Sequence, residues 1–149
     1  MPDDNPKGLK YLGYAIKNLT RCVKEDDLAP FAITALLFLS VDVRKQAKPG
    51  PVKGLEEPAK YLSGLQACLK GKGPLEYGLA QAYVDLNTAG RVSQGVSGLS
   101  RLMQQFSAQP EAYLMLSRHH SLRKEYADEK RVLAQAMAKC TEFQSYPER

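Results

Sequence analysis

The sequence of 149 residues predicts an all-α fold. Three observations support this prediction. Apolar residues recur at spacings of three and four along most of the chain, which is the period of a helix buried on one side. No long stretch alternates apolar and polar residues, and no Asn-Gly or Asp-Gly turn joins two β-branched runs. Glycine and proline gather at a few points and divide the chain into helical segments.

The first helix is expected over residues 7–24 and the second over residues 28–46. Asp26 or Asp27 is placed to cap the second helix, and Pro30 suits its first turn. The apolar stretch 28–43 is shorter than the roughly 20 residues that cross a bilayer. It is therefore expected in a protein core, and a homodimer through the two N-terminal helices is the alternative.

Residues 47–54, "AKPGPVKG", break the helical pattern because they contain two prolines and two glycines. Five further helices are expected after this break, which makes seven in all. Pro58 lies in the opening turn of the third. Their predicted ranges are 56–70, 75–89, 92–107, 111–123 and 126–143.

From residue 61 on, the chain repeats at an offset of 34 residues. "YLSGLQACL" (61–69) aligns with "GVSGLSRLM" (95–103) and "EKRVLAQAM" (129–137). Three apolar columns result: Leu65, Leu99 and Leu133; Cys68, Leu102 and Ala136; Leu69, Met103 and Met137. The helices before them repeat with a different step, since Leu79 and Leu116 are 37 residues apart.

A helix pair of this length resembles the tetratricopeptide repeat (TPR). "YLMLSRHH" supplies Tyr113, Leu116, Ser117 and His120, followed by Tyr126, Leu133 and Ala136. "EYGLAQAY" supplies Leu79, Ala80 and Tyr83, followed by Gly95, Leu99 and Leu102. The resemblance implies a single domain over residues 1–149, with repeats at about 28–70, 75–107 and 111–143 behind an N-terminal helix. It also implies antiparallel pairs in a right-handed TPR-like superhelix.

The same resemblance implies a non-enzymatic protein–protein interaction module, an adaptor or chaperone-like subunit whose concave groove holds a peptide or a partner helix. Its inward-facing positions correspond here to Tyr77, Gln81, Val84, Asp85, Leu114, Arg118, Ser121 and Leu122. Tyr77 and Leu114 stand where a clamp for a peptide carboxylate needs polar or cationic groups, so no such clamp is expected. The layout also looks similar to chaperones of type III secretion, which is kept as an alternative.

The net charge is +5, and basic residues gather between Arg44 and Lys72. These residues are Arg44, Lys45, Lys48, Lys53, Lys60, Lys70 and Lys72. A basic stretch of this kind allows binding to nucleic acid. It lacks interleaved aromatic residues, so a solvated surface is the favoured interpretation.

The residues that carry chemistry in enzymes form no convergent set. His119 and His120 have neither an H-x-x-x-H spacing nor a nearby cysteine, so no metal site is expected and His120 is assigned to packing. No phosphate-binding glycine motif is present, and neither an enzyme nor a cofactor is predicted. The cysteines Cys22, Cys68 and Cys140 form no C-x-x-C pair, and no secretory signal is visible, so a cytoplasmic location is expected.

Overall fold

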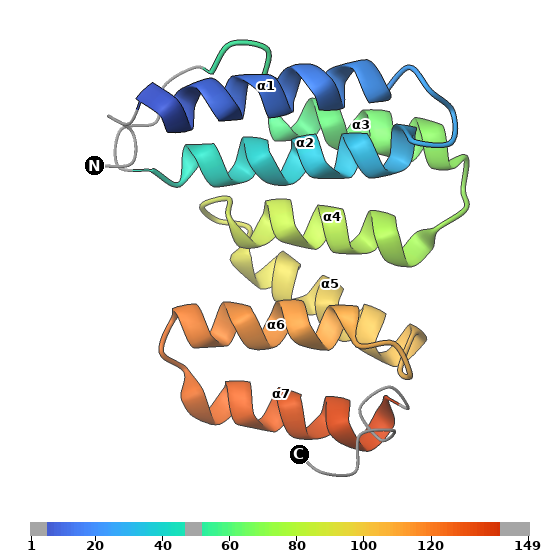
Figure 1. Ribbon diagram of the computed structural model, residues 1–149. Helices are drawn as coiled ribbons and strands as arrows, with labels where there is room; N and C mark the ends of the chain where they lie inside the picture. Colours follow the sequence, from blue (N-terminus) through green and yellow to red (C-terminus); the bar gives the residue numbers. More distant parts are fainter. Residues whose placement is uncertain (1–5, 47–51, 141–149) are drawn as a thin grey trace, which may run out of the picture. The chain divides into compact units, whose positions relative to one another are not determined.

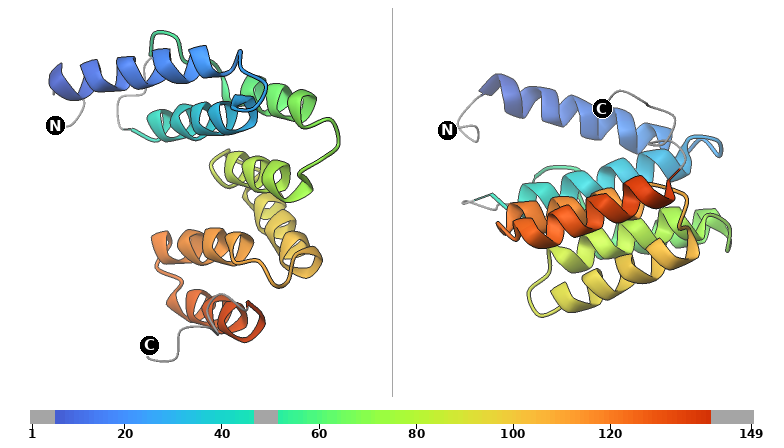
Figure 2. Two further views of the ribbon diagram at one scale, coloured as in Figure 1. Left: turned by 45° about the vertical axis from the view of Figure 1, so that its right-hand side comes forward. Right: turned by 90° about the horizontal axis from the view of Figure 1, so that it is seen from below.

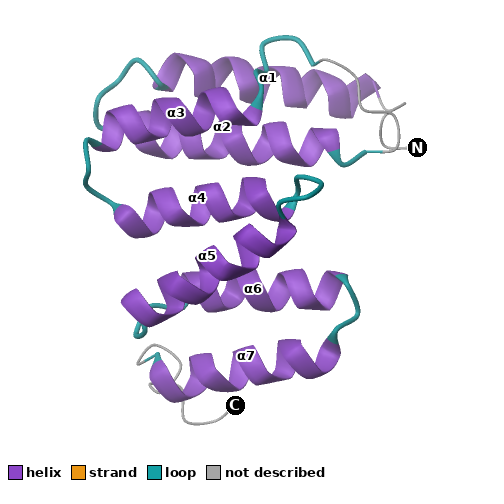
Figure 3. Cartoon of the chain, turned by 180° about the vertical axis from the view of Figure 1, so that it is seen from behind, coloured by secondary structure: helices purple, strands orange, loops and turns teal. Residues whose placement is uncertain are grey.

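The computed structural model describes residues 6–46 and 52–140 of the chain. Seven α-helices and no strand lie in these residues, as the sequence predicts (Figures 1 and 3). The helices are α1 (Pro6–Cys22), α2 (Ala29–Arg44), α3 (Pro58–Leu69), α4 (Pro74–Leu86), α5 (Val92–Gln105), α6 (Glu111–Leu122) and α7 (Tyr126–Lys139). The last helix is shorter than expected, because the backbone of Cys140 is extended; residues 141–143 lie outside the described residues.

Proline marks the start of several helices. Pro30 and Pro58 lie in the first turns of α2 and α3, and Pro74 is the first residue of α4. The first backbone N–H groups of a helix have no partner within it, so proline loses no hydrogen bond there. The predicted roles of Pro30 and Pro58 are confirmed.

The prediction that Asp26 or Asp27 caps α2 is wrong. The residue at the cap position is Leu28, and no side chain makes a capping hydrogen bond there. The preceding turn supplies an acceptor instead, because the N–H groups of Leu28 and Ala29 both donate to the carbonyl of Glu25, at 3.0 and 2.8 Å. With these donors already bonded, the two exposed aspartates have less to gain from capping.

The chain divides into two compact units, Met1–Gly73 and Pro74–Arg149. In the first unit α2 packs against both α1 and α3. Ile33, Leu36 and Leu37 of α2 are buried, together with Ile16 of α1 and Leu65 of α3. The apolar stretch 28–43 therefore contributes to a core, as predicted, and no helix among the described residues is long and apolar enough to span a membrane. The single domain over residues 1–149 stays a prediction.

The second unit consists of two helix pairs. α4 packs against α5, and α6 packs against α7, each pair antiparallel (Figure 2). The first helix of the second pair, α6, also contacts both α4 and α5. A shared core of apolar residues runs through these helices and includes Leu75, Leu99, Leu116, Val132 and Ala136. Neither pair buries this core alone.

Two glycines allow α4 and α5 to approach closely. A Cβ atom added at Gly95 would lie 2.9 Å from the backbone nitrogen of Leu86, and one at Gly78 would lie 2.8 Å from a methyl group of Leu102. Real Cβ atoms do not come so near to a backbone atom. The short contact between the two helices therefore depends on the missing side chain of Gly95.

Buried positions of the two helix pairs correspond at a step of 37 residues, and two of the three predicted columns fail in α7; Ala136 of the remaining column is buried. At this step buried Leu75 corresponds to Ala112, Ala80 to Ser117, Gly95 to Val132, and Leu99 to Ala136; all eight residues are buried. The residue aligned with Leu65 and Leu99 at the predicted offset is Leu133, which is 36% exposed, whereas Val132 beside it is fully buried. Met137, placed with Leu69 and Met103, is 60% exposed.

The error has a geometrical cause. α4 and α6 begin 37 residues apart, at Pro74 and Glu111, but α5 and α7 begin only 34 residues apart, at Val92 and Tyr126. The connection before α7 is shorter, so α7 gains about one turn at its start. The offset of 34 follows the helix starts, whereas the buried side follows the step of 37. The two differ by three residues, which is about 300° around the helix, or roughly 60° short of a full turn.

Substitution of Gly95 by alanine tests the close approach of α4 and α5. Gly95→Ala is expected to lower the free energy of unfolding by about 1–3 kcal/mol, because the added methyl group meets backbone. Gly98 of the same helix is the matched control: an added Cβ would meet only the tip of Arg101, at 3.9 Å. Gly98→Ala is expected to raise that free energy by about 0.5–1 kcal/mol. Urea denaturation followed by circular dichroism measures both, and equal effects would contradict the packing argument.

Candidate functional site

The predicted groove positions of α4 lie along one side of that helix at spacings of four, three and one. Tyr77 and Val84 are half-buried and Gln81 is exposed. Asp85 is buried, and its carboxylate accepts a hydrogen bond from the Nε of Arg91 at 3.0 Å. Three of these side chains therefore retain some exposed surface, while Asp85 is held in an ion pair.

The predicted groove positions of α6 are more exposed. Leu114 is 44% and Leu122 68% exposed, Arg118 is exposed, and Ser121 is half-buried. Each position follows its counterpart in α4 by 37 residues, the step that the buried residues also show. The two sets thus correspond at this step, although Asp85 is buried and Leu122 is 68% exposed, and α4 and α6 are in contact.

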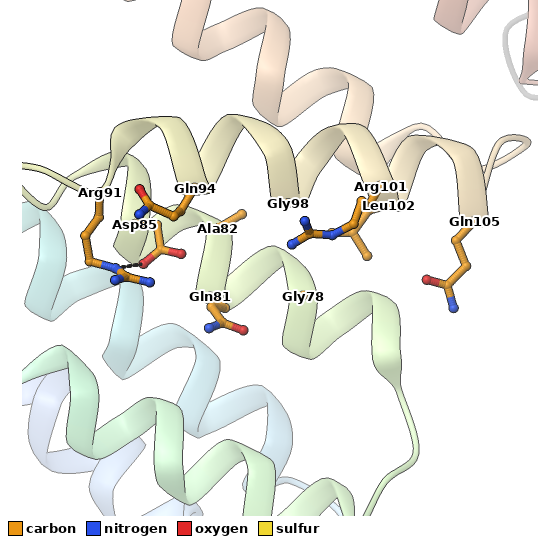
Figure 4. A pocket seen from close by; sticks show the side chains of 10 residues that line it. All are labelled: Gly78, Gln81, Ala82, Asp85, Arg91, Gln94, Gly98, Arg101, Leu102 and Gln105. Carbon is orange, nitrogen blue, oxygen red and sulfur yellow. Dashed lines mark hydrogen bonds and ion pairs between the residues drawn. The ribbon is translucent and has the colours of Figure 1, made fainter.

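Gln81 and Asp85 also line a hollow of about 300 Å³ formed by α4, α5 and their connection (Figure 4). We call it the polar hollow, since its rim carries Gln81, Asp85, Arg91, Gln94, Arg101 and Gln105. Small residues, among them Gly78, Ala82 and Gly98, leave room between the helices. Amide and guanidinium groups around a narrow hollow are suited to hydrogen bonding with the backbone of an extended peptide.

The contribution of α5 to this hollow was not predicted from the sequence. Gln94, Gly98, Arg101 and Gln105 are spaced by four, three and four residues, which places them on one side of a helix. That periodicity was a detectable signal. It was overlooked because the prediction for this helix followed its apolar residues, which form the three columns, and not its polar ones.

A second hollow, of about 580 Å³, lies among α5, α6 and α7. We call it the inner hollow. Its apolar wall includes Val96, Met103 and Leu116, and its polar wall includes His120, Arg131 and Lys139. No carboxylate of residues 6–46 and 52–140 lines it, so this wall favours neutral or anionic groups. None of Leu114, Arg118, Ser121 and Leu122 lines either hollow.

Tyr113 fixes the junction between α5 and α6. Its side chain is buried, and its hydroxyl donates to the carbonyl of Ser107 at 2.9 Å. Burial raises the pKa of this phenol above its usual value. Tyr113 was predicted as the large aromatic of its repeat, and the structure places it in the core.

The turn between α6 and α7 is closed by backbone bonds. Lys124 has φ of 60°, its N–H donates to Ser121 O at 3.0 Å, and the N–H of Glu125 donates to His120 O at 2.8 Å. This is the Schellman pattern that ends many helices, with lysine in the left-handed position usually taken by glycine. It brings the side chains of residues 120 and 125 together.

His120, Glu125 and Asp128 form a cluster that the sequence analysis did not predict. The ring Nδ1 of His120 lies 3.0 Å from a carboxylate oxygen of Glu125, and one potential ligand atom from each of the three residues lies within 4.8 Å of the others. Both carboxylates also meet arginines: Glu125 lies 3.5 Å from Arg123 and Asp128 lies 3.3 Å from Arg131. The spacing of five and three crosses a helix end, so a search for ligands within one helix overlooks it.

The cluster has an electrostatic explanation that needs no ion. Glu125 and Asp128 lie at the start of α7, where the helix dipole favours negative charge, and His120 lies near the end of α6. The hydrogen bond from His120, followed by the attraction of Arg123, lowers the pKa of the Glu125 carboxyl group. Burial, aided by His120 and Arg123, lowers the pKa of His119.

The basic stretch between Arg44 and Lys72 is partly neutralised in the first unit. Arg44 pairs with Glu57 at 3.0 Å, Lys45 pairs with Asp42 at 3.3 Å, and Lys60 pairs with Glu56. Lys53, Lys70 and Lys72 are exposed, and Lys48 lies outside the described residues. These ion pairs lower the local charge available to a polyanion.

Comparison with models of protein families, with curated proteins and with solved structures finds no match for this chain. The resemblance to the tetratricopeptide repeat therefore rests on the residues of the chain itself.

The pKa shifts of His119 and Glu125 predict that acid weakens the fold. The pKa of His119 is lowered in the folded protein, so the unfolded chain takes up a proton first as the pH falls through about 6.5, and stability is lost. Glu125 acts in the same direction below about 4.5, since its folded pKa is also lowered. The free energy of unfolding from urea denaturation is expected to fall between pH 7 and pH 4.

His119→Asn and Glu125→Gln separate the two contributions. His119→Asn is expected to reduce the dependence of the free energy of unfolding on pH between about pH 7 and pH 5. Glu125→Gln is expected to reduce that dependence below about pH 5. An unchanged slope above pH 5 in His119→Asn would show that this histidine does not contribute.

Proposed function

We propose that this chain is a non-enzymatic protein–protein interaction module, an adaptor or chaperone-like subunit, that binds a peptide or a partner helix along the exposed sides of α4 and α6. The proposal includes a tetratricopeptide-like organisation, with the helix pairs arranged as a right-handed superhelix and the module working in the cytoplasm.

The observation that carries the proposal is the packing of α6. This helix contacts its own partner α7 and both helices of the preceding pair, so the second pair extends the first by one step. Buried positions recur at the same step of 37 residues in the two pairs. Arrays built by stacking equivalent pairs have first helices that lie next to each other, and these form a continuous binding surface.

The side chains on that surface suit a peptide with both apolar and polar groups. Tyr77, Leu114 and Leu122 provide apolar area, while Gln81 and Arg118 provide hydrogen-bond donors. An aromatic residue and an arginine at the centre of a contact are the residue types that most often dominate binding energy. The polar hollow adjoins Gln81 and adds further amide groups.

Two alternatives rest on weaker support. A type III secretion chaperone-like protein agrees with one helix, α1, before the pairs. Association with nucleic acid through residues 44–72 is disfavoured, because Arg44, Lys45 and Lys60 already pair with carboxylates. Such association also predicts a mobility shift at low salt that disappears steeply as salt increases.

Single substitutions in α4 and α6 test the proposed surface. Tyr77→Ala, Leu114→Ser and Arg118→Glu are each expected to raise the Kd of a bound peptide about tenfold or more, the loss typical of a dominant contact residue. Peptides are first selected on an array probed with the full chain, and Kd is then measured by fluorescence anisotropy.

Leu28→Ser is the matched control. Leu28 is 42% exposed, close to the 44% of Leu114, but lies before α2 in the first unit. It is expected to leave the Kd unchanged. A peptide whose affinity ignores all three substitutions in α4 and α6, or responds equally to Leu28→Ser, would show that the binding surface lies elsewhere.

A further inference from the structure

The polar hollow between α4 and α5 receives two guanidinium groups. Arg91 lies directly before α5 and Arg101 lies within that helix, and both line the hollow. In Figure 4 the two guanidinium groups point toward each other across the hollow. Two positive charges directed into one space favour an anion there.

Asp85 fixes the direction of Arg91. Its carboxylate accepts a hydrogen bond from the Nε of Arg91 at 3.0 Å, and its side chain is only 12% exposed. This bond uses one N–H group, whereas a guanidinium carries further N–H donors on its two Nη atoms. The Arg91 side chain forms no other hydrogen bond with the described residues, so these donors are available to a ligand.

Arg101 reaches the hollow across a glycine. A Cβ atom added at Gly98 would lie 3.9 Å from Nη2 of Arg101, so the arginine side chain runs along α5 toward the start of the helix. Arg101 is exposed and forms no ion pair in the part of the chain that the structure describes. A ligand can therefore bind Arg101 without first breaking an ion pair.

The charge around the hollow is positive. Its lining contains two arginines and one carboxylate, that of Asp85, which leaves an excess of one positive charge. The other carboxylate within residues 74–110 belongs to Glu76. Glu76 precedes Gly78 by two residues, or about 200° around α4, and so lies on the side opposite the hollow. No residue of α5 is acidic, and the start of this helix adds a partial positive charge.

This excess of one charge favours a carboxylate over a phosphate. A phosphorylated side chain carries a charge of about −1.5 to −2 at pH 7, and Asp85 would repel the part that the arginines do not offset. A carboxylate carries a single charge and accepts two parallel N–H bonds from a guanidinium. Gln81 and Gln94 lie beside the arginines and can bond to the amide groups next to such a carboxylate.

We propose that the polar hollow binds the side-chain carboxylate of a glutamate or aspartate in a bound peptide, between Arg91 and Arg101. The proposal rests on the proposed function, because Gln81 belongs both to the groove positions of α4 and to the lining of the hollow. Gln81 lies near the middle of α4, so a peptide in the groove continues on both sides of it. Such a peptide presents a side chain to the hollow, and not its carboxyl terminus.

Two small probes test the hollow without the groove. N-acetylglutamic acid α-amide carries the carboxylate, and N-acetylglutamine α-amide is its neutral isostere. The full chain is titrated with each probe at low salt, and the Nε–H signals of its arginines are followed by NMR. The signals of Arg91 and Arg101 are expected to shift saturably, with a Kd for the glutamate probe at least about tenfold below that for the glutamine probe. Equal Kd values, or an unshifted Arg101 signal, would overturn the proposal.

An arginine outside the hollow provides the matched control. Arg101→Gln is expected to raise the Kd of the glutamate probe at least about tenfold. Arg118 is also exposed on its helix but does not line the hollow, so Arg118→Gln is expected to leave this Kd unchanged. Equal effects of the two changes would mean that the probe binds exposed arginines in general, and the proposal would be wrong. Circular dichroism checks that both variants keep their helices.

Other anions distinguish other ligands. N-acetylphosphoserine α-amide represents a phosphorylated side chain, and N-acetylglycine represents the carboxyl terminus of a peptide. Both are expected to bind more weakly than the glutamate probe. Tighter binding of the first would identify a phosphate site, and tighter binding of the second would identify a site for a chain terminus. Either result overturns the proposal.

A peptide selected for the groove links the hollow to the proposed function. Replacing its acidic residues one at a time by their amides is expected to raise its Kd at least about tenfold at one position, and Arg101→Gln is expected to abolish that difference. Peptides that bind with no dependence on any acidic residue would overturn the proposal while leaving the groove intact. Leu114→Ser is expected to weaken the peptide but not the glutamate probe, so failure of the groove is distinct from failure of the hollow.

Discussion

The second unit depends on the contact of α6 with both helices of the preceding pair. An isolated helix pair has apolar residues on an outer side that its own two helices cannot cover. Leu116 and Tyr113 of α6 cover these residues, because they belong to the core that contains Leu75, Leu99 and Leu102. The hydroxyl group of Tyr113 then bonds to the carbonyl of Ser107 at the end of α5, which satisfies a polar group inside the apolar contact.

The same stacking determines which surfaces stay available. The side of α4 and α6 that carries the proposed groove faces away from the core, so Gln81, Leu114 and Arg118 keep exposed surface. On α5, Val96 and Ser100 are half-buried, whereas Leu133 and Met137, which lie 37 residues later on α7, are exposed among the described residues.

Electrostatics act mainly at the helix ends. The turn between α6 and α7 joins a negative helix end to a positive one, and His120 and Glu125 place complementary groups across it. Asp85 and Arg91 form a comparable pair after α4, although Asp85 also borders the polar hollow. These interactions explain how charged residues can lie near the core of a protein with net charge +5 without any unpaired buried side-chain atom among the described residues.

The sequence by itself determined the helices. Apolar spacing and the positions of proline gave the ranges of α1 to α6 to within three residues, because these signals act between neighbours in the chain. It also placed the stretch 28–43 in a core, since apolar residues on nearly every side of a helix need neighbours all around. Only the tertiary structure decided which side of α7 is buried. Val132 and Leu133 are equally plausible as core residues in sequence, and the choice depends on how a shortened connection rotates α7 against α6. The polar hollow and the His120 cluster were likewise out of reach, because their members meet across helices and helix ends, where spacing along the chain does not determine distance in space.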